Sequence, residues 1–311
     1  MSADPPSESS VTYEQLQDIE DEFEELELEL LRQQAKLSKP LFAKRAELVA
    51  DIPNFWPLVM EQSPCEIDEF IQPSDAALLL GSLRSLSVDR FELPDGGDPR
   101  SIAIRFDFAD NDHFHDTTLE KKFWWRRAKN GWSGLVSEPV DIRWKSAEKD
   151  LTGGLVSLAR KVWDDHQAKQ ESDAKKKLKE VMNKTGLGGV SFFAWFAFRG
   201  RAISAQESDE AAEAARQARQ QGRQVDDDTD SESDEYEDDL EVFPMADDVA
   251  VAIAEDLWPS AIKYFIQAQE QEAMSDAAFE SDGDVSAEHE EEVEDEAGGE
   301  ERPKKRRRNG E

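Results

Sequence analysis

The chain has 311 residues, of which 71 are acidic and 37 are Lys or Arg, so its formal net charge at pH 7 is -34. This excess repels phosphate backbones and anionic membrane surfaces, which argues against direct nucleic-acid binding and favours a strongly basic protein as the partner. The single cysteine, Cys65, excludes an internal disulfide and any zinc site built from several cysteines. No apolar run is long enough to cross a membrane, so no membrane association is expected.

Residues 1–12 are polar and acidic, and we expect them to be disordered and to carry no secretory signal. Residues 13–52 predict one long helix, because apolar side chains recur there with the three-four spacing of a heptad seam. The seam consists of Leu16, Ile19, Phe23, Leu26, Leu30 and Leu37. One narrow apolar stripe with acidic flanks predicts dimerisation through a second copy; packing on the chain's own domain is the alternative. Pro40 predicts a kink or break near residue 40.

Between Ser85 and Lys145 the apolar period changes to two, which predicts an antiparallel meander of four strands. We place the strands at Leu86–Leu93, Ile102–Phe108, Leu119–Trp125 and Val140–Trp144. In the third, Phe123 and Trp125 should face the core, while Trp124 and Arg126 face outward. Helices before and after the sheet must cover its apolar face, so residues 53–268 predict one α+β domain.

Two acidic stretches interrupt or follow this domain. An insert at about 204–241 begins as a candidate solvated helix and then holds eleven acids in the sixteen positions from Asp226 to Glu241. Residues 269–311 predict a disordered tail that is free of Lys and Arg as far as residue 301. The tail ends in a compact basic cluster, which indicates nuclear import, with shuttling to the cytoplasm left open. The cluster is Lys304, Lys305, Arg306, Arg307 and Arg308.

The sequence predicts no catalytic, cofactor or metal site. His113 and His115 have the spacing of two metal ligands, but no cysteine or third histidine lies near them in the sequence. Cys65 has no neighbouring base to activate it as a nucleophile. Trp124 and Arg126 resemble an aromatic and basic nucleic-acid surface, but their period-two placement favours a strand.

Six ordered motifs between residues 52 and 265 resemble the SET-type nucleosome assembly proteins. They are Ile52-Pro53-Asn54-Phe55-Trp56, the stretch from Phe106 to Leu119, Ile142-x-Trp144-Lys145, Lys149-Asp150-Leu151-Thr152, Ser191-Phe192-Phe193-x-Trp195-Phe196, and Ile253 to Pro259 with Tyr264-Phe265. The resemblance implies a headphone-shaped homodimer: a long dimerisation helix, an earmuff domain built on the four-stranded antiparallel sheet, and an acidic tail. The insert, and a more basic stretch at Leu155–Leu187, depart from the family pattern.

The resemblance also implies a histone chaperone that binds core histones through its earmuff surface and tail, shields their charge and delivers them for nucleosome assembly. The expected histone-binding acids are Asp226, Asp227, Asp228, Asp247, Asp248, Glu255, Asp256, Glu290, Glu291, Glu292, Glu294, Asp295 and Glu296. The alternative is an acidic nuclear scaffold or inhibitor that docks a histone acetyltransferase or a phosphatase. An enzyme is the third hypothesis, and no motif supports it.

Overall fold

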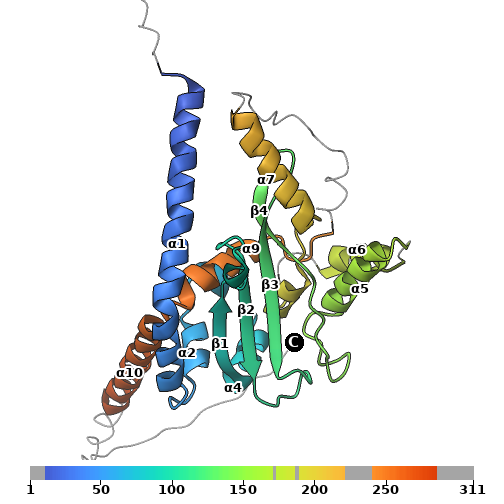
Figure 1. Ribbon diagram of the computed structural model, residues 1–311. Helices are drawn as coiled ribbons and strands as arrows, with labels where there is room; N and C mark the ends of the chain where they lie inside the picture. Colours follow the sequence, from blue (N-terminus) through green and yellow to red (C-terminus); the bar gives the residue numbers. More distant parts are fainter. Residues whose placement is uncertain (1–10, 171–172, 186–188, 221–239, 286–311) are drawn as a thin grey trace, which may run out of the picture. The chain divides into compact units, whose positions relative to one another are not determined.

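The computed structural model describes residues 11–170, 173–185, 189–220 and 240–285 (Figure 1). The chain divides into two units, Met1–Ala268 and Gln269–Glu311. The helices of the first unit are α1 (Tyr13–Val49), α2 (Phe55–Glu61), α3 (Cys65–Asp68), α4 (Pro73–Ser82), α5 (Leu155–Gln167), α6 (Asp173–Thr185), α7 (Ala205–Gln220) and α9 (Ala246–Ala252). The chain also forms the 3₁₀ helices η1 (Leu93–Asp95) and η2 (Phe192–Ala197) and the π-helix η3 (Ile253–Leu257), and α10 (Ala261–Val285) extends into the second unit.

The long helix α1 confirms the helix predicted from the heptad seam. It begins at a capping box, in which the Thr12 side chain accepts from the backbone N–H of Gln15 and the Gln15 side chain accepts from that of Thr12. The helix is continuous through Pro40. The break that the sequence allowed therefore does not occur, because an exposed helix can leave the freed carbonyl group to water.

The four strands form an antiparallel meander in the order β1-β2-β3-β4, as predicted. Their bounds are β1 (Leu83–Asp89), β2 (Ile102–Phe108), β3 (Thr118–Arg127) and β4 (Ser133–Ser137). The apolar face of β2 carries Ile102, Ile104, Phe106 and Phe108, all buried. The opposite face is polar and holds an ion pair between Arg105 and Asp107.

Two strand predictions were wrong in position. The first strand begins at Leu83 and ends at Asp89, and residues 93–95 form the 3₁₀ helix η1 instead. The fourth is Ser133–Ser137, whereas Val140–Trp144 lies outside the sheet. The reason is that Val140 donates its N–H to the carbonyl of Phe196, and Trp144 forms only an isolated bridge with Phe114. The short β4, with two large apolar residues, has almost no period-two signal of its own.

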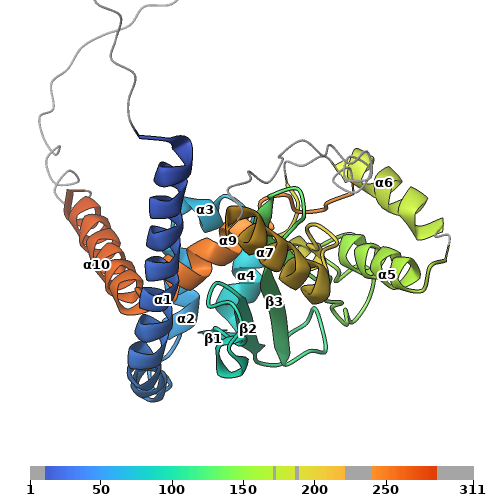
Figure 2. The ribbon, with the colours of Figure 1, turned by 45° about the horizontal axis from the view of Figure 1, so that its top comes forward.

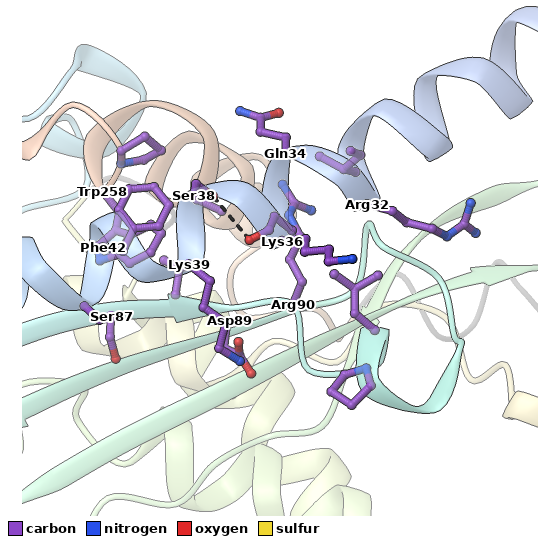
Figure 3. A pocket seen from close by; sticks show the side chains of 18 of the residues that line it. Arg32, Gln34, Lys36, Ser38, Lys39, Phe42, Ser87, Asp89, Arg90 and Trp258 are labelled. Atoms are coloured by element: carbon purple, nitrogen blue, oxygen red, sulfur yellow. Dashed lines mark hydrogen bonds between the residues drawn. The ribbon is translucent and has the colours of Figure 1, made fainter.

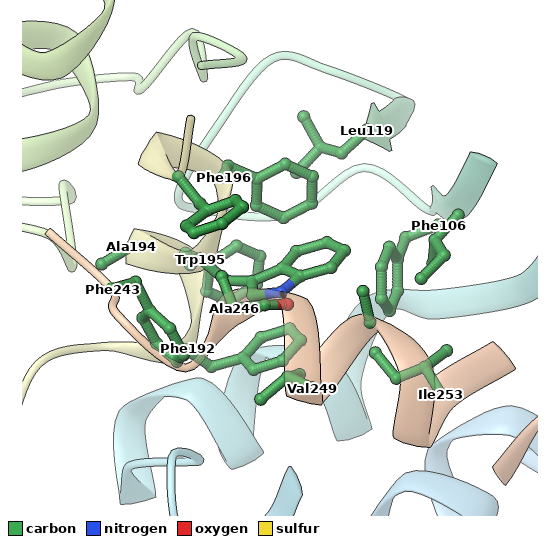
Figure 4. Packing of buried hydrophobic residues seen from close by; sticks show 14 of the residues in the cluster. Phe106, Leu119, Phe192, Ala194, Trp195, Phe196, Phe243, Ala246, Val249 and Ile253 are labelled. Carbon is green, nitrogen blue, oxygen red and sulfur yellow. Dashed lines mark hydrogen bonds between the residues drawn. The ribbon is translucent and has the colours of Figure 1, made fainter. Parts of the chain in front are cut away.

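The core forms where η2 and α9 cover the apolar face of the sheet (Figure 4). Phe192, Trp195 and Phe196 are fully buried and make edge contacts with Phe106 of β2. The indole N–H of Trp195 donates to the carbonyl of Ala246 at 2.8 Å, which satisfies the one polar atom of that side chain. These aromatic residues of the Ser191–Phe196 motif are therefore packing residues.

A buried lysine, Lys121, lies on this apolar face of β3 between Leu119 and Phe123. Its ammonium group donates to the carbonyls of Glu138, Phe196 and Phe198 at 2.8, 3.1 and 2.7 Å. The charge therefore joins β3 to the segment after β4 and to the end of η2. Burial lowers the pKa of Lys121 to about 7.

Glu241, the last residue of the predicted insert, is half-buried near this lysine. Its carboxylate accepts from the backbone N–H groups of Arg199 and Gly200 at 3.3 and 3.1 Å. Burial raises the pKa of Glu241, and the charge of Lys121 opposes that rise. Gly200 has φ +67°, and a Cβ there would lie 3.2 Å from the carbonyl oxygen of Leu135, so glycine fits this close approach. Glu241 is therefore a structural acid, although it is the last residue of the predicted acidic run.

Two helices differ from their sequence predictions. The start of the insert is helical, as expected, but α7 is not fully solvated, since Ala211 and Ala215 are buried and Ser208 accepts from the backbone N–H of Arg127. The helix α10 continues to Val285, so residues 269–285 of the predicted disordered tail are helical. Alanine, glutamine and glutamate are abundant there, and all three favour helix.

Candidate functional site

The long helix α1 presents two stripes of side chains on nearly opposite faces. One stripe faces its own domain and is partly or fully buried: Asp21, Glu24, Leu28, Leu31, Ala35, Ser38, Phe42, Arg45 and Val49. The other is the predicted seam, offset by about two residues. Its six members, Leu16, Ile19, Phe23, Leu26, Leu30 and Leu37, are between 52% and 71% exposed. The seam therefore does not pack on its own domain, which removes the alternative that the sequence left open.

The C-terminal half of α1 is anchored to the domain by Arg45, which is 8% exposed. Its guanidinium group lies 4.8 Å from the ring centroid of Trp258 and 5.6 Å from that of Trp56, and it donates to the carbonyls of Trp258 and Pro259. Burial lowers the pKa of Arg45 to about 10. Phe42 packs on Trp258 with 4.0 Å between ring centroids. This contact fixes where the helix leaves the domain.

The N-terminal half of α1 touches the domain through Glu24. Its carboxylate pairs with Arg100 at 2.9 Å and with Arg127 at 3.9 Å. Arg100 also pairs with Asp98 and lies 4.1 Å over the ring of Trp125. An ion-pair cluster at one end and an aromatic anchor at the other thus hold the helix and leave its seam outward.

A groove of about 620 Å³ runs between α1 and the end of β1, on the face of the helix away from the seam (Figure 3). Phe42 and Trp258 form an apolar wall, and Arg32, Lys36 and Lys39 project from α1 around the opening. The exposed seam and this groove are separate surfaces, because they lie on opposite sides of one helix.

The four predicted acids of the folded domain have different surroundings. Glu255 pairs with Arg90 at 3.6 Å, and Asp256 accepts from the hydroxyl of Tyr264 at 2.7 Å. Asp247 and Asp248 lie in the first turn of α9. Burial and the charge of Asp248 raise the pKa of Asp247.

Three further acids beside this turn were missed from the sequence. Glu66, Asp68 and Glu69 are exposed on or next to α3, and α3 packs against α9. Burial raises the pKa of Tyr264 to about 12, and the charges of Asp256 and Glu66 add to the rise. A helix of four residues after a proline has no periodicity, so only the structure could bring these acids to α9. We call Glu66, Asp68, Glu69, Asp247 and Asp248 the α3–α9 patch.

The remaining predicted site residues lie outside the described residues. They are Asp226, Asp227, Asp228, Glu290, Glu291, Glu292, Glu294, Asp295 and Glu296 for histone binding, and Lys304, Lys305, Arg306, Arg307 and Arg308 for nuclear import.

The described residues contain no group of three His, Cys, Asp or Glu side chains that could hold a metal ion. His113 instead contacts the carbonyl of Lys149 through Nδ1 at 3.0 Å. A hydrogen bond and the charge of Glu66 raise the pKa of the exposed Cys65 thiol, which opposes formation of a nucleophilic thiolate. No helix in the described part of the chain is long and apolar enough to span a membrane.

The tryptophan pair on β3 is oriented as predicted, but with partners that the sequence could not show. Phe123 is fully buried, and Trp125 packs partly on the core beneath Arg100. Trp124 faces the other way and makes an edge contact with Phe91. Arg126 pairs with Glu92 at 3.1 Å, and Lys122, which lies 5.2 Å over the ring of Phe91, pairs with Glu120 at 3.7 Å.

Comparison with known proteins gives one consistent family. The model of the nucleosome assembly protein (NAP) family matches residues 49–268. A Schizosaccharomyces pombe protein classed among the nucleosome assembly proteins is 29% identical over 86% of this chain and 85% of its own length. NAP1-related protein 2 of Arabidopsis thaliana is 26% identical over 83% of this chain and 78% of its own. The crystal structure of Ccp1 has a TM-score of 0.52 at 26% identity and covers 83% of this chain and 95% of that one. Since the family model spans well over half of the residues, the chain belongs to the nucleosome assembly protein family.

Proposed function

We propose that this chain is a dimeric histone chaperone that binds core histones through the α3–α9 patch and its acidic segments. The α3–α9 patch carries the proposal: its five carboxylates form no ion pair with a Lys or Arg of the described residues. Histones expose many Lys and Arg side chains that bind DNA non-specifically at low salt. Carboxylates that pair with these side chains delay this non-specific binding. Membership of the nucleosome assembly protein family supports the same role.

We propose that the acidic segments add to the charge that this patch offers a histone. The predicted acids of the insert and of the tail need no fixed geometry to neutralise a basic protein, because charge attraction does not depend on a precise fit. Release onto DNA follows when phosphates displace the carboxylates. We propose that the basic cluster at residues 304–308 directs the chain to the nucleus, where histones are deposited.

The seam of α1 supports the dimer. Six large apolar side chains exposed on one helix face would be costly in an isolated chain, and a second copy offers the matching stripe. Burying six such side chains per chain supplies on the order of 10 kcal/mol before entropy is counted.

The charge of α1 indicates how the two helices run. Residues 13–30 carry nine acids and no Lys or Arg, whereas residues 31–46 carry five Lys or Arg and no acid. Antiparallel helices place each acidic half against the partner's basic half, while parallel helices place like charges together. We therefore propose an antiparallel pair.

This orientation predicts the outcome of a mixing experiment with the variant Lys36→Glu, whose side chain is exposed and lies next to the seam residue Leu37. In an antiparallel pair each variant chain loses its favourable charge contact whether its partner is variant or wild type. When the variant is mixed with tagged wild-type chain, heterodimers should therefore form the statistical half of all dimers. Native mass spectrometry measures the fraction. Heterodimers in clear excess would indicate parallel pairing, in which the new acid faces the wild-type lysine.

The patch predicts a loss of histone affinity when its charge is removed. The variant Glu66→Gln, Asp68→Asn, Glu69→Gln, Asp247→Asn, Asp248→Asn should bind a purified pair of core histones roughly tenfold more weakly, as expected for four exposed carboxylates and the half-buried Asp247 at a few tenths of a kcal/mol each. Binding is measured at about 0.3 M salt, where the screening length is roughly 5 to 6 Å.

The matched control removes five exposed acids from other elements: Asp51→Asn, Asp112→Asn, Glu148→Gln, Asp209→Asn and Glu213→Gln. It has the same net charge, so it keeps the long-range attraction and should retain most of the affinity. Removal of residues 286–311 should weaken binding without abolishing it. Equal affinity of the patch variant and its control would show that the folded domain contributes no specific site.

A further inference from the structure

Helix α6 is a cationic surface on an acidic chain, and packing fixes its orientation. Ala174 and Leu178 are buried against α5, where Ala159 and Val162 are also buried. The solvent side of the helix carries five exposed lysines, Lys175, Lys176, Lys177, Lys179 and Lys184, against two exposed acids, Asp173 and Glu180, so it keeps a net positive charge. Figures 1 and 2 place α5 and α6 on the side of the sheet away from α1.

These lysines differ from the other cations of the domain, which are mostly paired with acids. Arg90, Arg100, Arg126 and Arg143 each contact a carboxylate at 3.6 Å or less. By contrast, Lys175, Lys176, Lys177 and Lys184 contact no carboxylate among residues 11–170, 173–185, 189–220 and 240–285. Like charges three or four residues apart on a helix repel each other and destabilise it. An external anion bound to this face would relieve the repulsion.

The chemistry of the face limits the partner. A histone is cationic and is repelled there, so the face does not serve the proposed cargo. A membrane surface would also draw on exposed apolar side chains, and the described residues of α5 and α6 present no large exposed apolar group. Several lysine charges on one helix, without apolar anchors, fit a phosphodiester backbone.

We propose that the solvent face of α6 binds the backbone of duplex DNA without sequence specificity. Lys175 and Lys184 are nine residues apart, about 14 Å along the helix, and duplex DNA carries roughly eight charges over that length. The net charge of the chain predicted no such binding, but screening confines repulsion by the remaining acids to about 10 Å at 0.1 M salt. The inference is independent of histone binding.

The test compares two variants of equal net charge for binding to a labelled duplex of about 30 base pairs, long enough to span the lysine face several times over. One changes Lys175, Lys176, Lys177 and Lys184 to Gln; the control changes Lys122, Lys129, Lys149 and Lys263, which lie on other elements. Both are made in the full chain, with and without Lys304 to Arg308 changed to Gln, so that the tail does not hide the effect of α6. Glutamine is nearly as favourable as lysine in helices, so α6 should remain folded, and circular dichroism checks this.

Fluorescence anisotropy at about 50 to 200 mM salt should show at least roughly tenfold weaker binding for the α6 variant than for the control. The slope of log affinity against log salt should fall by roughly three to four, since each lost phosphate contact removes about 0.9. Equal loss in both variants, or no DNA binding by the wild type at the lowest salt, would overturn the proposal. Tighter binding of a labelled polyglutamate peptide to α6 would also overturn it, in favour of an acidic segment.

Discussion

Replacing Leu26 and Leu30 with Asn should convert the proposed dimer into a monomer. Both side chains are more than half exposed in the single chain, at 53% and 55%, so they contribute little to the stability of the domain. In a paired seam each dimer would bury four of these leucines, and their loss removes roughly 6 kcal/mol or more of association free energy. We therefore expect the dimer dissociation constant to rise more than about 1,000-fold. Sedimentation velocity at micromolar concentration measures the change.

The control for this prediction is Gln17→Asn with Gln34→Asn on the same helix. Both glutamines are exposed and lie outside the seam, and the changes carry the same helix-propensity cost of asparagine without removing apolar surface. The control should remain dimeric. If the leucine variant also stays dimeric while its melting temperature falls, the seam packs within one chain, and the proposed dimer interface is wrong.

The sequence predicted those features whose signal is carried by neighbours along the chain. The seam of α1 and the β2 strand follow from local periodicity. In each case the residues that form the signal also form the contact.

Features that depend on distant partners could not be predicted in the same way. The apolar alternation at Val140–Trp144 is strong and predicts the fourth strand there. Val140 instead donates its N–H to Phe196 of η2, and Ser133–Ser137, whose alternation is weaker, pairs with β3. The acids of α3 join α9 only through the fold. Glu241 looks like one more acid of the insert, but backbone groups about forty residues earlier bind it.

Lys121 is the sharpest example, and it carries the largest expected effect on stability. Its position between Leu119 and Phe123 is an inward position of β3, where a charge is expected only if it is paired. The three carbonyl acceptors come from segments up to 77 residues away. Changing Lys121 to Met removes three buried hydrogen bonds. Val140 still donates to the carbonyl of Phe196, and Ser137 to that of Glu138, so among the described residues the carbonyl of Phe198 is the one that loses its donor. We expect the free energy of unfolding to fall by about 2 to 3 kcal/mol.

Lys122→Met is the matched control, because Lys122 is the next residue on the same strand and faces outward. Its ammonium group makes only exposed contacts among the described residues, an ion pair with Glu120 at 3.7 Å and a position 5.2 Å over the ring of Phe91. Chemical denaturation should show a change of no more than about 0.5 kcal/mol for this variant. Similar destabilisation of both variants would mean that the loss reflects strand propensity and not the three buried hydrogen bonds.

The same lysine predicts a pH dependence that the Met variant should lack. Burial lowers its folded pKa to about 7 from the ordinary value of 10.5. Between these values the unfolded chain binds more protons than the folded chain, so the free energy of unfolding rises with pH across this window. Denaturation of the wild type and of Lys121→Met from about pH 7 to 10 measures the difference. A difference that stays constant with pH would show that the ammonium group remains protonated in the core, stabilised by its three carbonyl acceptors.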